Sequence, residues 1–331
     1  MGIELYSNND IKALIKSLIT KKREPHSIAV CGDRGLGKKA MARYIAASLL
    51  CEQNNGEPCG KCKACRMMAH GVHPDFIEIK SNDNGNYQVD VIREMVSDAV
   101  VKPNEGRVKI YLIPDLDRSA NTAVQVQNIL LKLIEEPPEH CVIILTAASK
   151  EIFLQTVISR VLCLRVSPCS KEDSVDFLKK AGNYSSEEIE NAVDFGGGNI
   201  GKCIEFLEDK TVAESIGIAE NCFTAILNND EYGFLKSLFS ADGKKQLFRR
   251  VLMLLSEGFC NACLVRSGYD RESGCLSEQA KLLAERISED DCERLYEIVY
   301  QHLNKLESNA NLGLTTNCLT AAIFEMLQQK H

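Results

Sequence analysis

The chain reads His26-Ser27-Ile28-Ala29-Val30-Cys31-Gly32-Asp33-Arg34-Gly35-Leu36-Gly37-Lys38-Lys39 near its start, and this stretch decides the fold. The apolar run from Ile28 to Cys31 predicts a buried strand, three glycines then predict a loop, and apolar residues at helical spacing follow. A strand, a glycine-rich loop and a helix in this order are typical of a phosphate-binding loop. In such a loop, backbone N–H groups and the positive end of the helix face the phosphate oxygens.

The loop departs from the pattern of active nucleotide-binding loops at one position. Gly32, Gly37 and Lys38 fit the pattern G-x-x-x-x-G-K, which continues with a serine or threonine. The hydroxyl of that residue holds Mg²⁺, but this chain has Lys39 there, and an ammonium group cannot coordinate a cation. The sequence therefore predicts a phosphate cradle without a metal ligand, and we expect weak or no binding of ATP or ADP.

Length and composition describe an ordinary globular protein. The 331 residues are 45% hydrophobic and 26% charged, enough for two or three domains of roughly 100–200 residues each. A net charge of −7 gives no general attraction to nucleic acid, so a DNA contact needs a local patch or a partner. Without a signal peptide or an apolar run of about 20 residues, we expect a cytoplasmic protein with no membrane segment.

Four of the fifteen cysteines form a cluster with the spacing C-x7-C-x2-C-x2-C: Cys51, Cys59, Cys62 and Cys65. Four thiolates at these separations can close a tetrahedron around Zn²⁺. Since all four coordination positions are then filled by the protein, the ion is expected to be structural. A redox dithiol is the alternative, although such a motif needs two cysteines and not four.

The other eleven cysteines are scattered through helical or strand-like segments, and we expect most of them to be buried small hydrophobic residues. Cys260 and Cys263 share C-x-x-C spacing, but they lie inside a helical pattern without a second pair. They are interpreted as packing residues.

A second apolar run, 107–113, predicts another buried strand, and polar residues follow it. In ATPases of this class the end of the strand carries an Asp for Mg²⁺ and then a Glu that polarises the attacking water. Pro114 and Asp115 occupy those two positions, and Asp117 matches a further common acid. A register shift of one residue makes Asp115 the metal ligand but leaves Leu116 in place of the base. Either alignment removes one essential group.

Buried strands alternate with helices up to about residue 166, which indicates a parallel α/β sheet covered on both faces. The pattern includes a long helix from residue 119 to residue 136 and strands at 142–145 and 162–166. From about residue 171 to the end it is helical throughout.

Several motifs together resemble bacterial clamp-loader subunits of the AAA+ family. They are Pro25-His26-Ser27 before the loop, the four-cysteine insertion, the run N-I-L-L-K-L-I-E-E-P-P at 128–138, and Ser159-Arg160. The resemblance covers residues 1 to about 210, and beyond them only length and helical character. It implies an AAA+ P-loop domain at 1–167 that carries the four-Cys zinc module at 51–65. It also implies a helical lid domain at 168–209 and an all-helical collar for oligomerisation at 210–331.

The resemblance also implies a role for Arg160. In the family this arginine belongs to an S-R-C motif and stabilises charge on the γ-phosphate of a neighbouring subunit's ATP, an arginine finger in trans. Val161 replaces the usual Cys. A local salt bridge is the alternative for Arg160. Thr146 falls at the sensor-1 position, and Gly201 stands in place of the sensor-2 arginine, which agrees with a degenerate site.

By resemblance, the chain is expected to help load a sliding clamp on primer-template DNA during replication, without independent catalysis. The expected partners are gamma/tau-type and delta-type clamp-loader subunits, and the clamp and DNA through the assembly. Two alternatives stay open. An ATP-hydrolysing motor subunit needs Ser or Thr at position 39. A zinc-containing nucleic-acid-binding protein with a relic P-loop fold predicts salt-sensitive DNA binding by the chain alone.

Overall fold

The computed structural model describes residues 5–82, 85–118, 122–269, 276–307 and 311–328. The chain forms two compact units. The first comprises Met1–Phe177 and Gly198–Gly201, and the second comprises Leu178–Gly197 and Lys202–His331. The three-domain division expected from the sequence stays a prediction.

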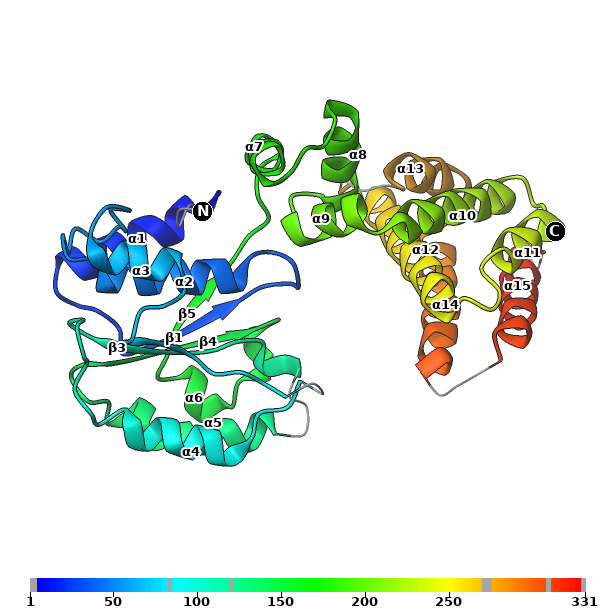
Figure 1. Ribbon diagram of the computed structural model, residues 1–331. Helices are drawn as coiled ribbons and strands as arrows, with labels where there is room; N and C mark the ends of the chain where they lie inside the picture. The colour runs from blue at the N-terminus through cyan, green and yellow to red at the C-terminus, as the bar shows by residue number, and fades with distance from the viewer. Residues whose placement is uncertain (1–4, 83–84, 119–121, 270–275, 308–310, 329–331) are drawn as a thin grey trace. The chain divides into compact units, whose positions relative to one another are not determined.

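The first unit is built on a five-stranded parallel sheet with the strand order β2-β3-β4-β1-β5 (Figure 1). The strands are β1 Ser27–Cys31, β2 Phe76–Glu78, β3 Lys109–Ile113, β4 Cys141–Ala147 and β5 Leu162–Arg165. Every residue of β1, β3 and β4 is buried, as expected for strands covered on both faces. The predicted parallel α/β sheet is confirmed, and the carboxyl ends of its strands meet at one edge.

Helices cover both faces of this sheet (Figure 1). Alternate residues of β1 point to opposite layers, so Ile28 and Val30 join one hydrophobic cluster while Ala29 and Cys31 join the other. The predicted long helix begins at Ala123, and residues 119–121 of that prediction lie outside the described residues. One layer contains α1 Asn9–Thr20, α2 Lys38–Leu50 and α3 Lys63–Ala69, and the other contains α4 Val89–Asp98, α5 Ala123–Glu135 and α6 Gln155–Ile158.

The rest of the described chain is helical, as its periodicity predicts. In the second unit, Phe223, Phe248 and Phe259 are fully buried in one continuous hydrophobic core. The helices after β5 are α7 Lys171–Ala181, α8 Ser186–Gly196, α9 Ile200–Glu208, α10 Lys210–Leu227, α11 Glu231–Phe239, α12 Lys245–Arg266, α13 Ser277–Arg286, α14 Glu289–Glu307 and α15 Leu312–Gln328. The division between the two units falls within α7 and again within α9. The helices in the described parts of the chain include none with the length and apolar composition of a membrane span.

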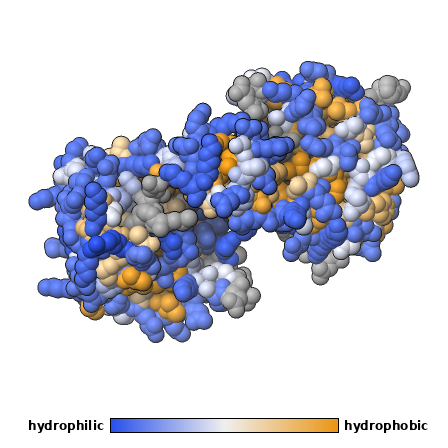
Figure 2. Space-filling view, turned by 45° about the horizontal axis from the view of Figure 1, so that its top comes forward, coloured by the Kyte–Doolittle hydropathy of each residue, from blue (hydrophilic) through white to orange (hydrophobic). Residues whose placement is uncertain are grey.

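The interpretation of Cys260 as a packing residue is wrong. On α12, Cys263 packs against the core of the second unit, but Cys260 is exposed. Successive residues of a helix point about 100° apart, so Cys260 can face solvent although its neighbour Phe259 is buried. Cys163 and Cys318 are also exposed. Polar and charged residues cover most of the face shown in Figure 2, and apolar residues reach the surface between them.

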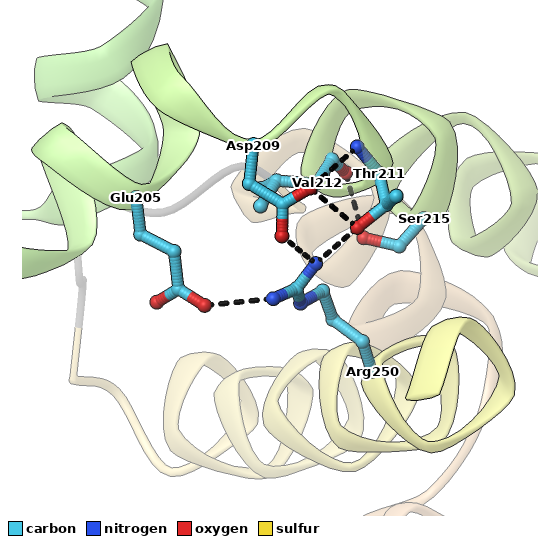
Figure 3. A network of polar contacts seen from close by, with 6 residues as sticks. All are labelled: Glu205, Asp209, Thr211, Val212, Ser215 and Arg250. Carbon is cyan, nitrogen blue, oxygen red and sulfur yellow. Dashed lines mark hydrogen bonds and ion pairs between the residues drawn. The ribbon is translucent and has the colours of Figure 1, made fainter. Parts of the chain in front are cut away.

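A polar network joins three helices of the second unit (Figure 3). Arg250 on α12 donates from Nη1 to Asp209 Oδ2 at 2.9 Å and from Nη2 to Glu205 Oε1 at 2.7 Å. Nη1 also donates to Thr211 Oγ1 at 2.6 Å. Asp209 in addition caps α10, because its Oδ1 accepts the Thr211 N–H at 2.9 Å. These contacts cross the expected boundary between residues 209 and 210.

Candidate functional site

The candidate nucleotide loop lies between β1 and α2, where the sequence places it. Gly35 and Gly37 have φ values of +91° and +83°, a conformation that other residues rarely adopt. Gly32 anchors the beginning of the loop, since its N–H donates to the carbonyl groups of Ala147 and Ala148 at 3.2 and 3.1 Å. The loop is thereby fixed to the carboxyl end of β4.

The two lysines that end the loop are engaged by the protein itself. Lys38 is buried, and its Nζ donates to the carbonyl of Asp33 at 3.2 Å. Lys39 Nζ lies 2.5 Å from Glu78 Oε1, and Arg43 contacts the other oxygen of that carboxylate at 2.8 Å. Although burial opposes it, hydrogen bonds from these two cations lower the pKa of Glu78. An ion pair therefore stands where an active loop offers a metal-binding hydroxyl.

The segment Gly198–Gly201 packs directly on this loop. The N–H of Gly201 donates to the Gly35 carbonyl at 2.9 Å, and Asn199 Nδ2 donates to the Arg34 carbonyl at 2.8 Å. A Cβ atom at position 201 would lie 2.4 Å from the Cα of Gly35. An arginine at the sensor-2 position therefore does not fit unless the backbone moves.

Polar side chains at the carboxyl ends of β3 and β4 serve to join the two strands. Thr146 Oγ1 accepts the N–H of Asp115 at 2.7 Å, and Asp117 Oδ1 accepts the N–H of Ala148 at 2.9 Å. Thr146 is fully buried. The Thr146 hydroxyl and one oxygen of the Asp117 carboxylate therefore make internal hydrogen bonds at this edge of the sheet.

Arg160 lies in the turn between α6 and β5, at the surface. Its Nε is 3.2 Å from Glu135 Oε1, and its Nη1 donates to the Thr156 carbonyl at 3.0 Å and to Ser159 Oγ at 3.1 Å. The side chains of Arg160 and Glu135 are 44% and 46% exposed. An exposed pair of this kind contributes under about 1 kcal/mol to stability. The local salt bridge is thus present in the single chain, and the guanidinium remains accessible.

The four clustered cysteines converge as the spacing predicts. The Sγ atoms of Cys51, Cys59, Cys62 and Cys65 all lie within 4.8 Å of one another. Zn–S bonds of about 2.3 Å in a tetrahedron imply S–S separations of about 3.8 Å, and Cys59 and Cys65 are 3.9 Å apart.

Backbone N–H groups point at two of these sulfurs. The N–H of Cys62 donates to Cys59 Sγ at 3.4 Å, and the N–H of Cys65 donates to Cys62 Sγ at 3.3 Å. Backbone donation by Lys61 and Cys62 lowers the pKa of the Cys59 thiol to about 6, whereas burial raises the pKa of Cys51. Four soft ligands with N–H donors behind them suit Zn²⁺.

The known proteins that this chain is similar to include subunits of DNA polymerase III. Residues 7–170 match the family model described as DNA polymerase III, delta subunit. The DNA polymerase III subunit gamma of Buchnera aphidicola is 33% identical over 232 residues, 67% of this chain and 62% of that protein. The DNA polymerase III subunit delta' of Pseudomonas aeruginosa is 29% identical over 191 residues, 57% of each chain.

Among solved structures, a DNA polymerase III gamma subunit-related protein of Thermotoga maritima matches with a TM-score of 0.45 and 17% identity, over 95% of this chain and 99% of that one. The chain spans less than two thirds of the length of the curated relatives named above. With the sheet, the loop and the matched segment taken together, the chain belongs to the clamp-loader subunits of DNA polymerase III within the AAA+ family.

Proposed function

We propose that this chain is a delta-prime-type subunit of the DNA polymerase III clamp loader, which helps to load the sliding clamp on primer-template DNA. Its own ATP site is degenerate. The observation that carries the proposal is the pair between Lys39 and Glu78, which places two charged side chains where Mg²⁺ needs a hydroxyl ligand. The similarity to the subunit delta' of Pseudomonas aeruginosa also supports the delta-prime type.

Two further observations support a site that does not hydrolyse ATP. Thr146 Oγ1 and Asp117 Oδ1 each accept a backbone N–H, so both side chains take part in joining the ends of β3 and β4. Gly201 touches the loop backbone, which leaves no space for an arginine that senses the γ-phosphate. ATP is therefore bound and hydrolysed in neighbouring subunits of the gamma/tau type, with a delta-type subunit as a further partner.

In this proposal Arg160 completes the ATP site of a neighbour. A guanidinium on the surface can reach across a subunit boundary, where it stabilises the negative charge that develops on the transferred γ-phosphate. The exposure of Arg160 supports this role, because 44% of its side chain is accessible to a neighbouring subunit.

The proposal includes a structural Zn²⁺ held by the thiolates of Cys51, Cys59, Cys62 and Cys65. When bound, the ion cross-links residues 51–65 and leaves no open coordination position for catalysis. The convergence of the four sulfurs supports this assignment.

A second candidate, an ATP-hydrolysing gamma/tau-type subunit, is favoured by the 33% identity with a subunit gamma. Mg²⁺-dependent phosphate release by the purified chain separates the two candidates. The delta-prime type predicts no turnover by the chain alone and DNA-stimulated turnover after reconstitution with gamma/tau- and delta-type subunits. Steady turnover by the isolated chain favours the motor subunit instead.

A further inference from the structure

The guanidinium of Arg160 is held on two sides by oxygens of its own chain. Nε lies 3.2 Å from Glu135 Oε1, and Nη1 donates to the Thr156 carbonyl and to Ser159 Oγ at 3.0 and 3.1 Å. A planar group fixed through two of its three nitrogens has a defined orientation. Within the described part of the chain, the contacts of Arg160 leave Nη2 without an acceptor, so this nitrogen is available to an oxygen from outside.

We infer that Glu135 is a positioning residue for Arg160. Its carboxylate holds Nε and thereby sets the plane in which Nη2 is presented to the γ-phosphate of a neighbouring subunit. The inference rests on the proposed function, because it takes Arg160 as the arginine finger. Glu135 itself touches no substrate in this account and acts only through Arg160.

The placement of Glu135 suits such a role. It is the last residue of α5, and the paired prolines Pro137-Pro138 follow almost directly, so its backbone is fixed by the helix end. Arg160 has a long side chain with many rotamers. If Glu135 holds this side chain before the neighbour docks, less conformational entropy of Arg160 is lost on reaching the transition state. Loss of the carboxylate should therefore lower kcat and leave the KM for ATP unchanged.

The pair contributes orientation rather than stability. Both side chains are nearly half exposed, and such pairs add little to the free energy of folding. A substitution at Glu135 should therefore leave folding and assembly intact. Glu136 is the matched control, because it is also exposed and acidic, is adjacent in sequence, and makes no contact with Arg160 in the described structure.

The test is DNA-stimulated ATP turnover by the complex reconstituted with gamma/tau- and delta-type subunits. Five versions of this chain are compared with the wild type: Glu135→Ala, Glu135→Gln, Glu136→Ala, Arg160→Ala and the double variant Glu135→Ala/Arg160→Ala. The part of kcat that is lost in Arg160→Ala defines the Arg160-dependent rate. We expect Glu135→Ala to lower that rate about 3- to 10-fold with an unchanged KM.

The remaining variants separate positioning from other roles. Glu135→Gln keeps the size of the side chain but removes the charge that attracts Nε, so it should lower the rate about as much as Glu135→Ala. Glu136→Ala should match the wild type. The double variant should equal Arg160→Ala, since Glu135 acts only through Arg160. The positioning role is wrong if Glu135→Ala has no effect while Arg160→Ala lowers turnover. It is also wrong if the turnover of the double variant is lower than that of Arg160→Ala. In both cases the arginine-finger role of Arg160 is still supported. If Arg160→Ala has no effect, the finger and the positioning role both fail.

Discussion

Lys39 Nζ and Glu78 Oε1 lie 2.5 Å apart, so the first turn of α2 is tied by an ion pair to β2. Arg43 contacts the same carboxylate, which gives Glu78 two cationic partners. A Mg²⁺ ion and a lysine ammonium group repel each other, and the lysine offers no lone pair. The ion pair therefore joins α2 to β2 and puts an ammonium group at the position that follows the loop.

Restoring the missing hydroxyl should not restore catalysis. Lys39→Thr supplies the metal ligand, but Pro114 and Gly201 still stand where other groups of an active site are required. We expect no Mg²⁺-dependent phosphate release above background from the purified variant. Turnover that appears with this single change would mean that the remaining site is intact.

A side chain at position 201 should disturb the loop. A Cβ there meets the backbone of Gly35 at 2.4 Å, so Gly201→Ala forces the two segments apart and should cost about 1–3 kcal/mol of stability. Gly217→Ala is the control, because position 217 is helical and a Cβ there meets nothing within 4 Å. That change should be neutral or stabilising. Urea unfolding of both variants measures the difference, and equal midpoints would refute the close packing.

Asp75 should stabilise the first unit in a pH-dependent way. It is fully buried, and its carboxylate accepts the N–H groups of Asn104, Glu105 and Gly106 at 2.6, 2.8 and 2.6 Å. Burial opposes ionisation, but these donors win and lower the pKa of Asp75 below 3.8. Asp75→Ala should cost about 2–3 kcal/mol at pH 7.

The sign of the pH effect follows from that lowered pKa. The unfolded chain binds the proton more readily, so the contribution of Asp75 is complete above pH 3.8 and is lost as the pH falls through the folded pKa. The gap between the urea midpoints of wild type and Asp75→Ala should be constant well above pH 3.8 and should narrow as the pH falls below it. The exposed Asp90 provides the control, since Asp90→Asn should leave the midpoint at pH 7 unchanged. A constant gap between wild type and Asp75→Ala at every pH would show that the charge of Asp75 is not the cause.

Removal of zinc should loosen residues 51–65. The purified chain should contain about one Zn²⁺, and a chelator should lower its Tm by about 5 °C or more, because metal binding is coupled to folding. Cys59→Ser should lose the metal, whereas Cys163→Ser, an exposed cysteine outside the cluster, should keep it. Metal analysis and thermal melting check this. Full zinc content in Cys59→Ser would exclude the four-thiolate site.

Local patterns made the central features predictable. The strand, loop and first helix follow from fourteen consecutive residues, because buried apolar runs and glycines act over short distances. The four cysteines lie within fifteen residues, so their spacing alone brings the sulfurs together.

Contacts between distant segments were not predictable in this way. The pairing of Lys39 with Glu78 depends on where β2 and α2 lie in the layered fold, and no pattern in the sequence gives that placement. The packing of Gly201 on Gly35 joins segments 166 residues apart. For Arg160, the sequence indicated a local salt bridge as an alternative but did not identify Glu135 as its partner.

Under the proposed function, this chain lacks a working ATP site and completes the ATP site of a neighbouring subunit. The direct test compares Lys38→Ala and Arg160→Ala in the reconstituted complex, with DNA-stimulated ATP turnover as the measurement. We expect wild-type turnover with Lys38→Ala, because that lysine already contacts its own loop, and reduced turnover with Arg160→Ala. Reduced turnover with Lys38→Ala and wild-type turnover with Arg160→Ala would contradict it.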